Sequence, residues 1–251
     1  MKTLDNYEYY KEHWEDTAQY LEKSAGVRWN KHMITWMLKH IEHNEIKQIY
    51  DLGCGAGNKT YFLAKLFPNA NVVGFDFSDA GIDEARKNYR LPNLKYEVKD
   101  ITRMSCEEAE SVDLVTLFDV LEHIENDKDC LNTFLNSAKP KYIMICVPTG
   151  KMYSSGIHSG HFRHYSKKGL EIILNQFNYT PIKTTEAGFP FVSPIFRDLS
   201  MLMSRKYESF YGSEIKGFAS IINGIWYFLF RFLSSKRFGS EFFGVFKRSK
   251  L

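Results

Sequence analysis

A glycine-rich turn near residue 50 is the feature that most constrains the fold of this chain. The segment Asp51-Leu52-Gly53-Cys54-Gly55-Ala56-Gly57 ends a short apolar run, and a helical pattern follows it up to Pro68. Glycines permit a tight strand-to-helix turn and let a ligand approach the backbone closely. The segment therefore predicts a strand, a turn and a helix whose first N–H groups can face a polar or anionic ligand.

Strand and helix patterns alternate along most of the chain. This alternation predicts an α/β fold with a doubly wound, mostly parallel sheet. Fully apolar runs are typical of strands that are covered on both faces. The predicted strands are 48–52, 71–75, 94–98, 112–118, 142–147, 180–185 and 242–247; the predicted helices are 7–24, 29–43, one after Gly57, 78–89, 129–137 and 166–177, with a loop at 153–165.

The length of 251 residues fits a single domain with an insertion. Its predicted parts are N-terminal helices at 1–45, a core at 46–190, a helical cap insertion at 191–240 and a final strand at 241–251. The N-terminal helices are interpreted either as a lid or as helices packed on the core.

Three ligand-binding patterns compete for the glycine-rich turn. A dinucleotide site needs GxGxxG and a P-loop needs GxxxxGK[ST], but Asn58 stands where each requires its last glycine. Lys59 and Thr60 do fit the P-loop pattern. The third pattern, an acidic residue followed by GxGxG, is matched at every position by Asp51, Gly53, Gly55 and Gly57. A turn that binds no ligand is the remaining alternative.

Further acidic residues follow the next predicted strands. Asp76 can accept hydrogen bonds from both hydroxyls of a ribose. A helix cap is its alternative role, although Ser78 can serve as that cap. Asp100 could bind an adenine amino group and Ile101 could cover the ring, or both could belong to an ordinary turn. The segment 118–123, Phe118-Asp119-Val120-Leu121-Glu122-His123, follows the fourth strand, and carboxyl ends of parallel strands line the ligand crevice in such sheets.

Taken together, these motifs resemble those of the class I S-adenosylmethionine (SAM) dependent methyltransferases. The resemblance is to the small-molecule group that includes ubiquinone-type and polysaccharide-cluster enzymes. It covers roughly residues 27–190 and 241–250, and it includes His161-Phe162-Arg163-His164-Tyr165-Ser166. It implies a Rossmann-like seven-stranded sheet with a final antiparallel strand, with a helical insertion before that strand, and SAM as the cofactor.

The resemblance also implies roles for individual residues. The three glycines would surround the methionine end of SAM, next to Asp51. Asp76 would bind the ribose, and Phe77 would also contact the cofactor. Asp100 and Ile101 would bind the adenine. Phe118 and Asp119 would line the pocket on the side of the sulfonium.

A hydroxyl acceptor gains from a base that removes its proton, and histidine titrates near working pH. The predicted catalytic residues are His123, His161 and His164; His123 could instead shape the pocket. The predicted substrate contacts are His158, Arg163 and Tyr165. Arg163 could grip a carboxylate or phosphate, or form an ion pair that holds the loop to the sheet. No cysteine or histidine spacing indicates a metal site.

The charge and composition of the chain indicate which kinds of partner it can bind and where it is expected to reside. The net charge of +3 is too small to indicate nucleic acid, although basic residues gather beyond Val192. The four cysteines form no CxxC pair and the N-terminus is densely charged, so a cytoplasmic location is expected. Residues 218–233 are apolar but too short to span a bilayer. They are interpreted as a buried cap helix, a dimer contact, or, within 218–237, a peripheral helix on an anionic membrane.

The expected function is O-methylation of a polar small molecule such as a sugar, a nucleotide sugar or a surface-glycan precursor. The alternatives are methylation of a lipid or quinone precursor, a non-catalytic SAM-binding protein, and an NAD-dependent oxidoreductase. The last would need the third glycine that Asn58 replaces.

Overall fold

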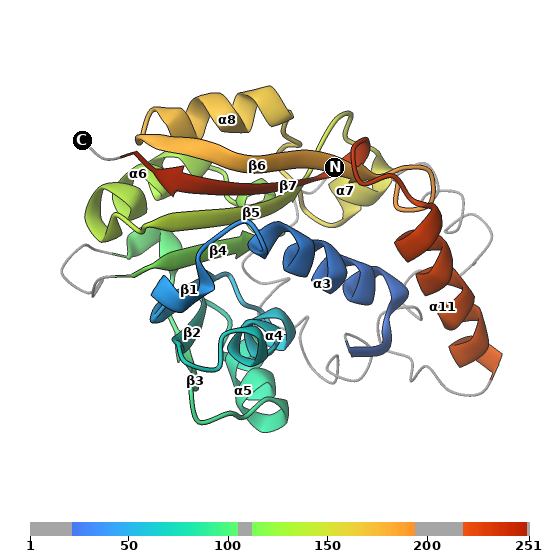
Figure 1. The fold of residues 1–251 in the computed structure, drawn as a ribbon, viewed down its shortest axis with the longest axis horizontal. Helices are drawn as coiled ribbons and strands as arrows, with labels where there is room; N and C mark the ends of the chain where they lie inside the picture. The colour runs from blue at the N-terminus through green and yellow to red at the C-terminus, as the bar shows by residue number, and fades with distance from the viewer. Residues whose placement is uncertain (1–21, 105–111, 194–217, 250–251) are drawn as a thin grey trace.

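The computed structural model describes residues 22–104, 112–193 and 218–249. Its centre is a seven-stranded sheet in the order β3-β2-β1-β4-β5-β7-β6 (Figure 1). The first five strands are parallel, and β7 runs antiparallel to both β5 and β6. The predicted doubly wound, Rossmann-like sheet with a final antiparallel strand is confirmed. The strands are β1 Gln48–Leu52, β2 Asn71–Asp76, β3 Leu94–Val98, β4 Leu114–Phe118, β5 Tyr142–Pro148, β6 Tyr179–Gly188 and β7 Gly239–Arg248.

Helices cover both faces of this sheet. The α-helices are α3 Ala25–Leu38, α4 Asn58–Leu66, α5 Asp79–Asn88, α6 Asp127–Ala138, α7 Ser154–His158, α8 Lys167–Asn175 and α11 Phe218–Phe228. Short 3-10 turns are η1 His43–Glu45, η2 Ile101–Arg103 and η4 Leu121–His123, and a π-helical turn, η5 Leu229–Leu233, continues α11.

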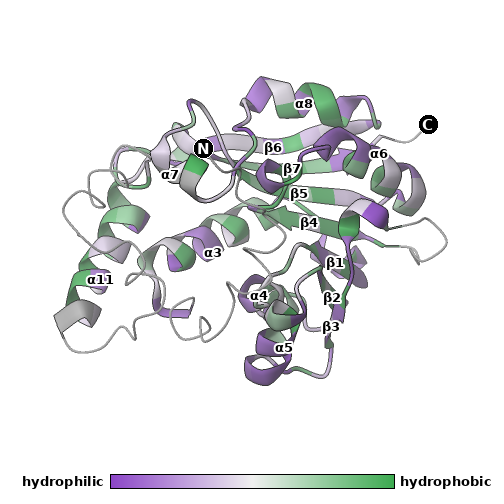
Figure 2. Ribbon diagram, turned by 180° about the vertical axis from the view of Figure 1, so that it is seen from behind, coloured by the Kyte–Doolittle hydropathy of each residue, from purple (hydrophilic) through white to green (hydrophobic). Residues whose placement is uncertain are grey.

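The sheet has a hydrophobic core on each face, because successive side chains of its strands point to opposite faces. In β5, Ile143 and Ile145 point into the core under α6 and α8, while Met144 and Cys146 point into the core under α3 and α4. Successive side chains of a strand face opposite sides, so a strand covered on both faces must be apolar throughout. Figure 2 shows the resulting hydrophobic colour along β4 and β5.

Element boundaries differ from the sequence-based expectations at several places. The helix expected at 29–43 begins at Ala25 and ends at Leu38, and the loop expected at 153–165 contains the short helix α7. Strand β6 extends to Gly188 because β7 supplies a paired partner along almost its whole length. Most of the helix expected at 7–24 lies outside the described residues.

The insertion leaves the sheet after β6 and returns at β7. Its described part, α11, lies beside α3 (Figure 1). Asn223 joins the two helices, because its Oδ1 accepts a hydrogen bond from the Ala25 N–H at 2.8 Å. The Arg28 guanidinium also lies over the Tyr227 ring, 3.7 Å from its centroid. Residues 194–217 of the expected cap lie outside the described part of the chain.

Helix α11 keeps an apolar side in solvent. Ile221, Ile225 and Phe228 are each more than half exposed, and hydrophobic colour runs along the helix in Figure 2. The interpretation of this segment as a buried cap helix is therefore wrong for the described residues. None of the described helices combines the length and the apolar character needed to cross a bilayer.

Candidate functional site

The glycine-rich turn lies between β1 and α4, as predicted, and its backbone has a left-handed conformation that glycine accepts easily. Gly53, Gly55 and Gly57 have φ angles of 72°, 51° and 78°. A Cβ atom on Gly53 would lie 2.5 Å from Cγ2 of Val120. The N–H groups of Gly53 and Cys54 donate to the Phe75 carbonyl at 2.8 and 2.9 Å, so β2 fixes the turn.

Asp51 supports this turn from inside the protein. Its Oδ2 accepts a hydrogen bond from the Thr60 hydroxyl at 2.7 Å, and its Oδ1 accepts one from the Thr116 hydroxyl at 2.6 Å. Burial raises the pKa of Asp51, and the two hydroxyls oppose that rise. The described contacts of Asp51 are therefore structural, and a direct contact with the cofactor stays a prediction.

Asp76 lies at the carboxyl end of β2, beside the glycine-rich turn. Its Oδ2 accepts the Gly55 N–H at 2.8 Å and its Oδ1 accepts the Ser78 N–H at 2.9 Å. Ser78 itself caps α5, because its hydroxyl accepts the Gly81 N–H at 3.1 Å. Ser78, and not Asp76, therefore caps α5. Burial raises the pKa of the Asp76 carboxyl. Phe77, the next residue, is half-buried.

The pair Asp100-Ile101 follows β3 at the same edge of the sheet. Asp100 Oδ1 accepts hydrogen bonds from the N–H and the hydroxyl of Thr102, at 2.9 and 2.7 Å. These contacts belong to an N-cap of η2 and match the ordinary-turn alternative. Ile101 packs into the core under α6. Adenine contacts by either residue stay predictions.

Asp119 forms a partly buried ion pair that the sequence analysis did not anticipate. The Lys59 ammonium lies 2.5 Å from Asp119 Oδ2 and 5.6 Å from the centroid of the Phe118 ring. Burial works against ionisation of Asp119, but the Lys59 charge outweighs it and lowers the pKa of the carboxyl. Asp119 also has a φ of 60°, an uncommon conformation for a non-glycine residue. Lys59 thus brings the first turn of α4 to the predicted sulfonium side of the pocket.

Three histidines gather beyond the end of β4. The rings of His123 and His161 meet edge to face, with centroids 4.6 Å apart. His161 Nδ1 lies 3.0 Å from His164 Nε2, within hydrogen-bond distance. Burial lowers the pKa of His123 to about 4, although the Asp119 charge opposes this, so the imidazole is neutral at pH 7. The structure brings all three predicted catalytic histidines together.

Glu122 belongs to the same group and was not assigned a role from the sequence. Its side chain is 1% exposed. Burial and the nearby Asp119 charge raise its pKa well above the ordinary value. The motif from Phe118 to His123 contained Glu122, but only the η4 turn shows that it points to the histidine cluster.

Arg163 and Tyr165 hold the loop that carries His161 and His164. The Arg163 guanidinium lies 3.0 Å from Asp127 Oδ1 and donates to the carbonyls of Ile124 and Glu125, both at 2.5 Å. The Tyr165 hydroxyl donates to Asp127 Oδ2 at 2.6 Å. These contacts match the ion-pair alternative for Arg163. Substrate contacts by Arg163, Tyr165 and His158, whose side chain lies outside the described atoms, stay predictions.

The described residues thus fit a SAM-binding site. The glycine-rich turn, Asp76, Asp100 and Phe118 all lie at the carboxyl edge of parallel strands, where ligands bind in open α/β sheets. The order of the seven strands and this edge are those of the class I SAM-dependent methyltransferase fold.

Comparison with known proteins agrees with this class. A family model described as a methyltransferase domain matches residues 43–173, which is more than half of the chain. The chain therefore belongs to this methyltransferase-domain family. The NAD-dependent alternative is set aside.

Two groups of curated relatives are similar in sequence. A trans-aconitate 2-methyltransferase of Variovorax paradoxus is 45% identical over 65 residues, which are 26% of this chain and 24% of that protein. The chain therefore spans about a quarter of the length of the first curated relatives that it matches. A ubiquinone biosynthesis O-methyltransferase of Coxiella burnetii is 29% identical over 167 residues, which are 64% of this chain and 67% of that protein.

Solved structures share the fold at low sequence identity. The N-methyltransferase NodS of Bradyrhizobium japonicum, in complex with S-adenosyl-L-homocysteine, has a TM-score of 0.61 and 14% identity, covering 98% of this chain and all (100%) of that one. The magnesium protoporphyrin IX methyltransferase of Synechocystis, with the same ligand, has a TM-score of 0.54 and 14% identity, covering 88% and 84%.

Proposed function

We propose that this methyltransferase transfers the methyl group of SAM to a hydroxyl of a polar small molecule, with a sugar, nucleotide sugar or surface-glycan precursor as the first choice. The observation that carries this proposal is the cluster of His123, His161 and His164 at the cofactor edge of the sheet. A hydroxyl must lose its proton as it attacks a methyl group, and imidazoles accept protons at neutral pH.

The cofactor supplies the activated methyl group. The chain aligns the acceptor with this methyl group, and different residues hold the cofactor and the acceptor. The glycine-rich turn and Asp76 hold the cofactor side, and the Lys59–Asp119 pair fixes the end of β4 just before the turn that carries His123. The loop clamped by Arg163 and Tyr165 holds His161 and His164 in place, so that the acceptor meets a fixed polar surface.

Replacing His123 with alanine is expected to lower the turnover number at least about a hundredfold, because this substitution removes a polar group at the acceptor end. SAM affinity is expected to change little, since the described contacts of the glycine-rich turn do not include His123. Turnover is measured with a radiolabelled methyl group on a panel of sugar nucleotides, and SAM affinity by calorimetric titration.

His40→Ala is the matched control, because His40 lies just beyond the end of α3, where its Nδ1 is 3.0 Å from the Met37 carbonyl and its ring meets Trp36 edge to face. Full turnover of the His123→Ala variant would remove His123 from the acceptor site. Methylation of amines with no methylation of hydroxyls would overturn the choice of oxygen as the acceptor atom.

A second acceptor class, a lipid or quinone precursor, is favoured by the exposed side of α11 and η5. Phe228, Phe232 and Leu233 are 55%, 62% and 56% exposed. Arg231, Lys236 and Arg237 lie close by in sequence. An apolar helix side flanked by cations fits the surface of an anionic membrane, where such acceptors reside.

If this second proposal holds, the Phe228→Ser/Phe232→Ser double variant should bind vesicles containing phosphatidylglycerol at least about tenfold more weakly than the parent protein, because each buried aromatic side chain contributes about 1.5–3 kcal/mol. Co-sedimentation measures the bound fraction. An Ile172→Ser variant is the control, since Ile172 is 52% exposed on α8, away from α11. Equal binding by all three proteins, or a dimer that disappears in the double variant, would assign α11 to another role.

A further inference from the structure

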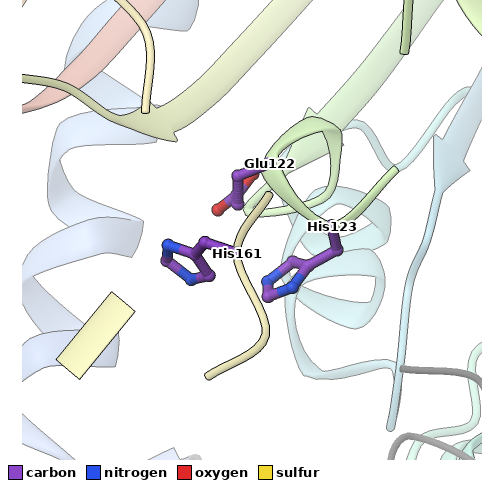
Figure 3. A group of neighbouring side chains, drawn as sticks. All are labelled: Glu122, His123 and His161. Atoms are coloured by element: carbon purple, nitrogen blue, oxygen red, sulfur yellow. The ribbon is translucent and has the colours of Figure 1, made fainter. Parts of the chain in front are cut away.

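Three side chains with metal-binding atoms converge beside the cofactor edge (Figure 3). Glu122 and His123 are adjacent on η4, and His161 comes from the loop after α7. One ligand atom from each residue lies within 4.8 Å of the other two. Two of these residues are neighbours in sequence and the third comes from a different loop, so no sequence spacing indicated the cluster.

One buried oxygen atom of this cluster accepts no hydrogen bond from the described residues. Glu122 Oε2 is fully buried and has no hydrogen-bond partner within the described part of the protein. A buried carboxylate oxygen without a partner is costly, so such atoms are rare unless a ligand or ion binds them. Glu122 is held in this position, because its own carbonyl accepts the Phe162 N–H at 2.8 Å from the loop of His161.

We propose that Glu122, His123 and His161 bind one divalent transition-metal ion. The sequence analysis expected no metal site, and the proposal departs from that expectation because tertiary structure alone assembles the three residues. It rests on the proposed O-methylation for its role: the ion would bind the acceptor oxygen beside the methyl group.

The donor set indicates the class of ion. Two imidazoles and one carboxylate suit Mn²⁺, Fe²⁺, Co²⁺ or Zn²⁺, whereas Mg²⁺ and Ca²⁺ prefer oxygen atoms alone. A ligand imidazole usually bonds a second group through its other nitrogen, which fixes the ring. The His161 Nδ1–His164 Nε2 contact at 3.0 Å is such a bond, so His164 acts as a positioning residue.

Three protein ligands leave coordination positions open for an acceptor. A divalent ion that binds a hydroxyl oxygen lowers the pKa of that hydroxyl and fixes its direction toward the methyl group. As the new C–O bond forms, the bond between the methyl carbon and the sulfonium sulfur of SAM breaks, S-adenosylhomocysteine leaves with the electron pair of that bond, and the hydroxyl proton passes to solvent or to a nearby base. In this arrangement His123 contributes to the proposed O-methylation as a metal ligand, and this role replaces that of direct proton acceptor.

The test titrates the full chain, freed of metal by chelation, with Mn²⁺ and follows the free ion by electron paramagnetic resonance; Zn²⁺ then serves as a competitor. About one Mn²⁺ per chain is expected. Glu122→Gln and His161→Ala are each expected to weaken binding about tenfold or more, since even residues behind the ligands affect metal affinity by that factor. His40→Ala is the control for binding to unrelated histidines.

Calorimetric titration with SAM checks that each variant is folded and binds its cofactor. If Glu122→Gln fails this check, His161→Ala carries the test alone. Failure of the wild type to deplete either ion, or equal Mn²⁺ binding by wild type and the SAM-competent variants, overturns the metal site. If the site binds Mn²⁺ but no hydroxyl acceptor is methylated, the proposed function fails and the metal site stands.

Discussion

Replacing Asp76 with alanine is expected to weaken the binding of SAM by more than about tenfold, because a hydrogen bond to a charged group contributes about 1.5–3 kcal/mol. The carboxylate lies at the end of β2 and also holds the glycine-rich turn through the Gly55 N–H. Its loss therefore removes the predicted ribose contact and loosens the backbone around it. Calorimetric titration with SAM and S-adenosylhomocysteine measures both affinities.

Asp79→Ala is the matched control for Asp76→Ala. Asp79 is an exposed acidic residue in the first turn of α5, three positions along the chain, and Ser78 provides the cap of that helix. Its replacement should leave SAM affinity within about twofold, since it is solvent-exposed and outside the turn. An unchanged dissociation constant in Asp76→Ala would remove Asp76 from the cofactor site.

Gly53→Ala is expected to lower the free energy of unfolding by about 2–5 kcal/mol. A positive φ costs a residue with a side chain about 1–2 kcal/mol, and overpacking adds about 1–3 kcal/mol. Both apply here, since φ is 72° and the new methyl group would lie 2.5 Å from the Val120 side chain. Urea denaturation followed by circular dichroism measures the change.

The Gly150→Ala variant separates the cost of the positive φ from the cost of overpacking. It has a φ of 81°, but a Cβ atom there would meet no atom within 4 Å. Gly150→Ala should therefore cost only the backbone part, about 1–2 kcal/mol. Adding Val120→Ala to Gly53→Ala should restore part of the lost stability by making room for the methyl group. Equal costs at Gly53 and Gly150 would show that the contact with Val120 has no effect.

Most of the fold was predictable because strand periodicity depends on local sequence. The apolar run in β5 predicted a strand buried on both faces, which the structure confirms. The parallel order of the strands placed Asp76 and Asp119 at one edge of the sheet. Ser78 was predicted as a helix cap from its position alone, and its bond to the Gly81 N–H confirms this.

The partners of individual side chains were less predictable, because distant segments supply them. The ion pair of Asp119 comes from Lys59 in α4, and the carboxylate of Glu122 meets His161 from a loop far along the chain. Arg163 was open to two interpretations, and only the position of Asp127 on α6 shows which contact it makes. The apolar composition of α11 did not reveal which of its sides faces solvent. That side is known only from the way the helix packs beside α3.

The pairing of β6 with β7 has a consequence for how this chain can change over evolutionary time. Gly188 and Gly239 are paired across the two strands, so residues 189–238 leave and re-enter the sheet at adjacent points. A segment whose ends already touch can be lengthened, shortened or exchanged with little loss of chain entropy elsewhere. The five parallel strands, which carry the cofactor edge, need not shift when this happens. The fold thus allows this segment to change in length while the paired ends at Gly188 and Gly239 keep their places in the sheet.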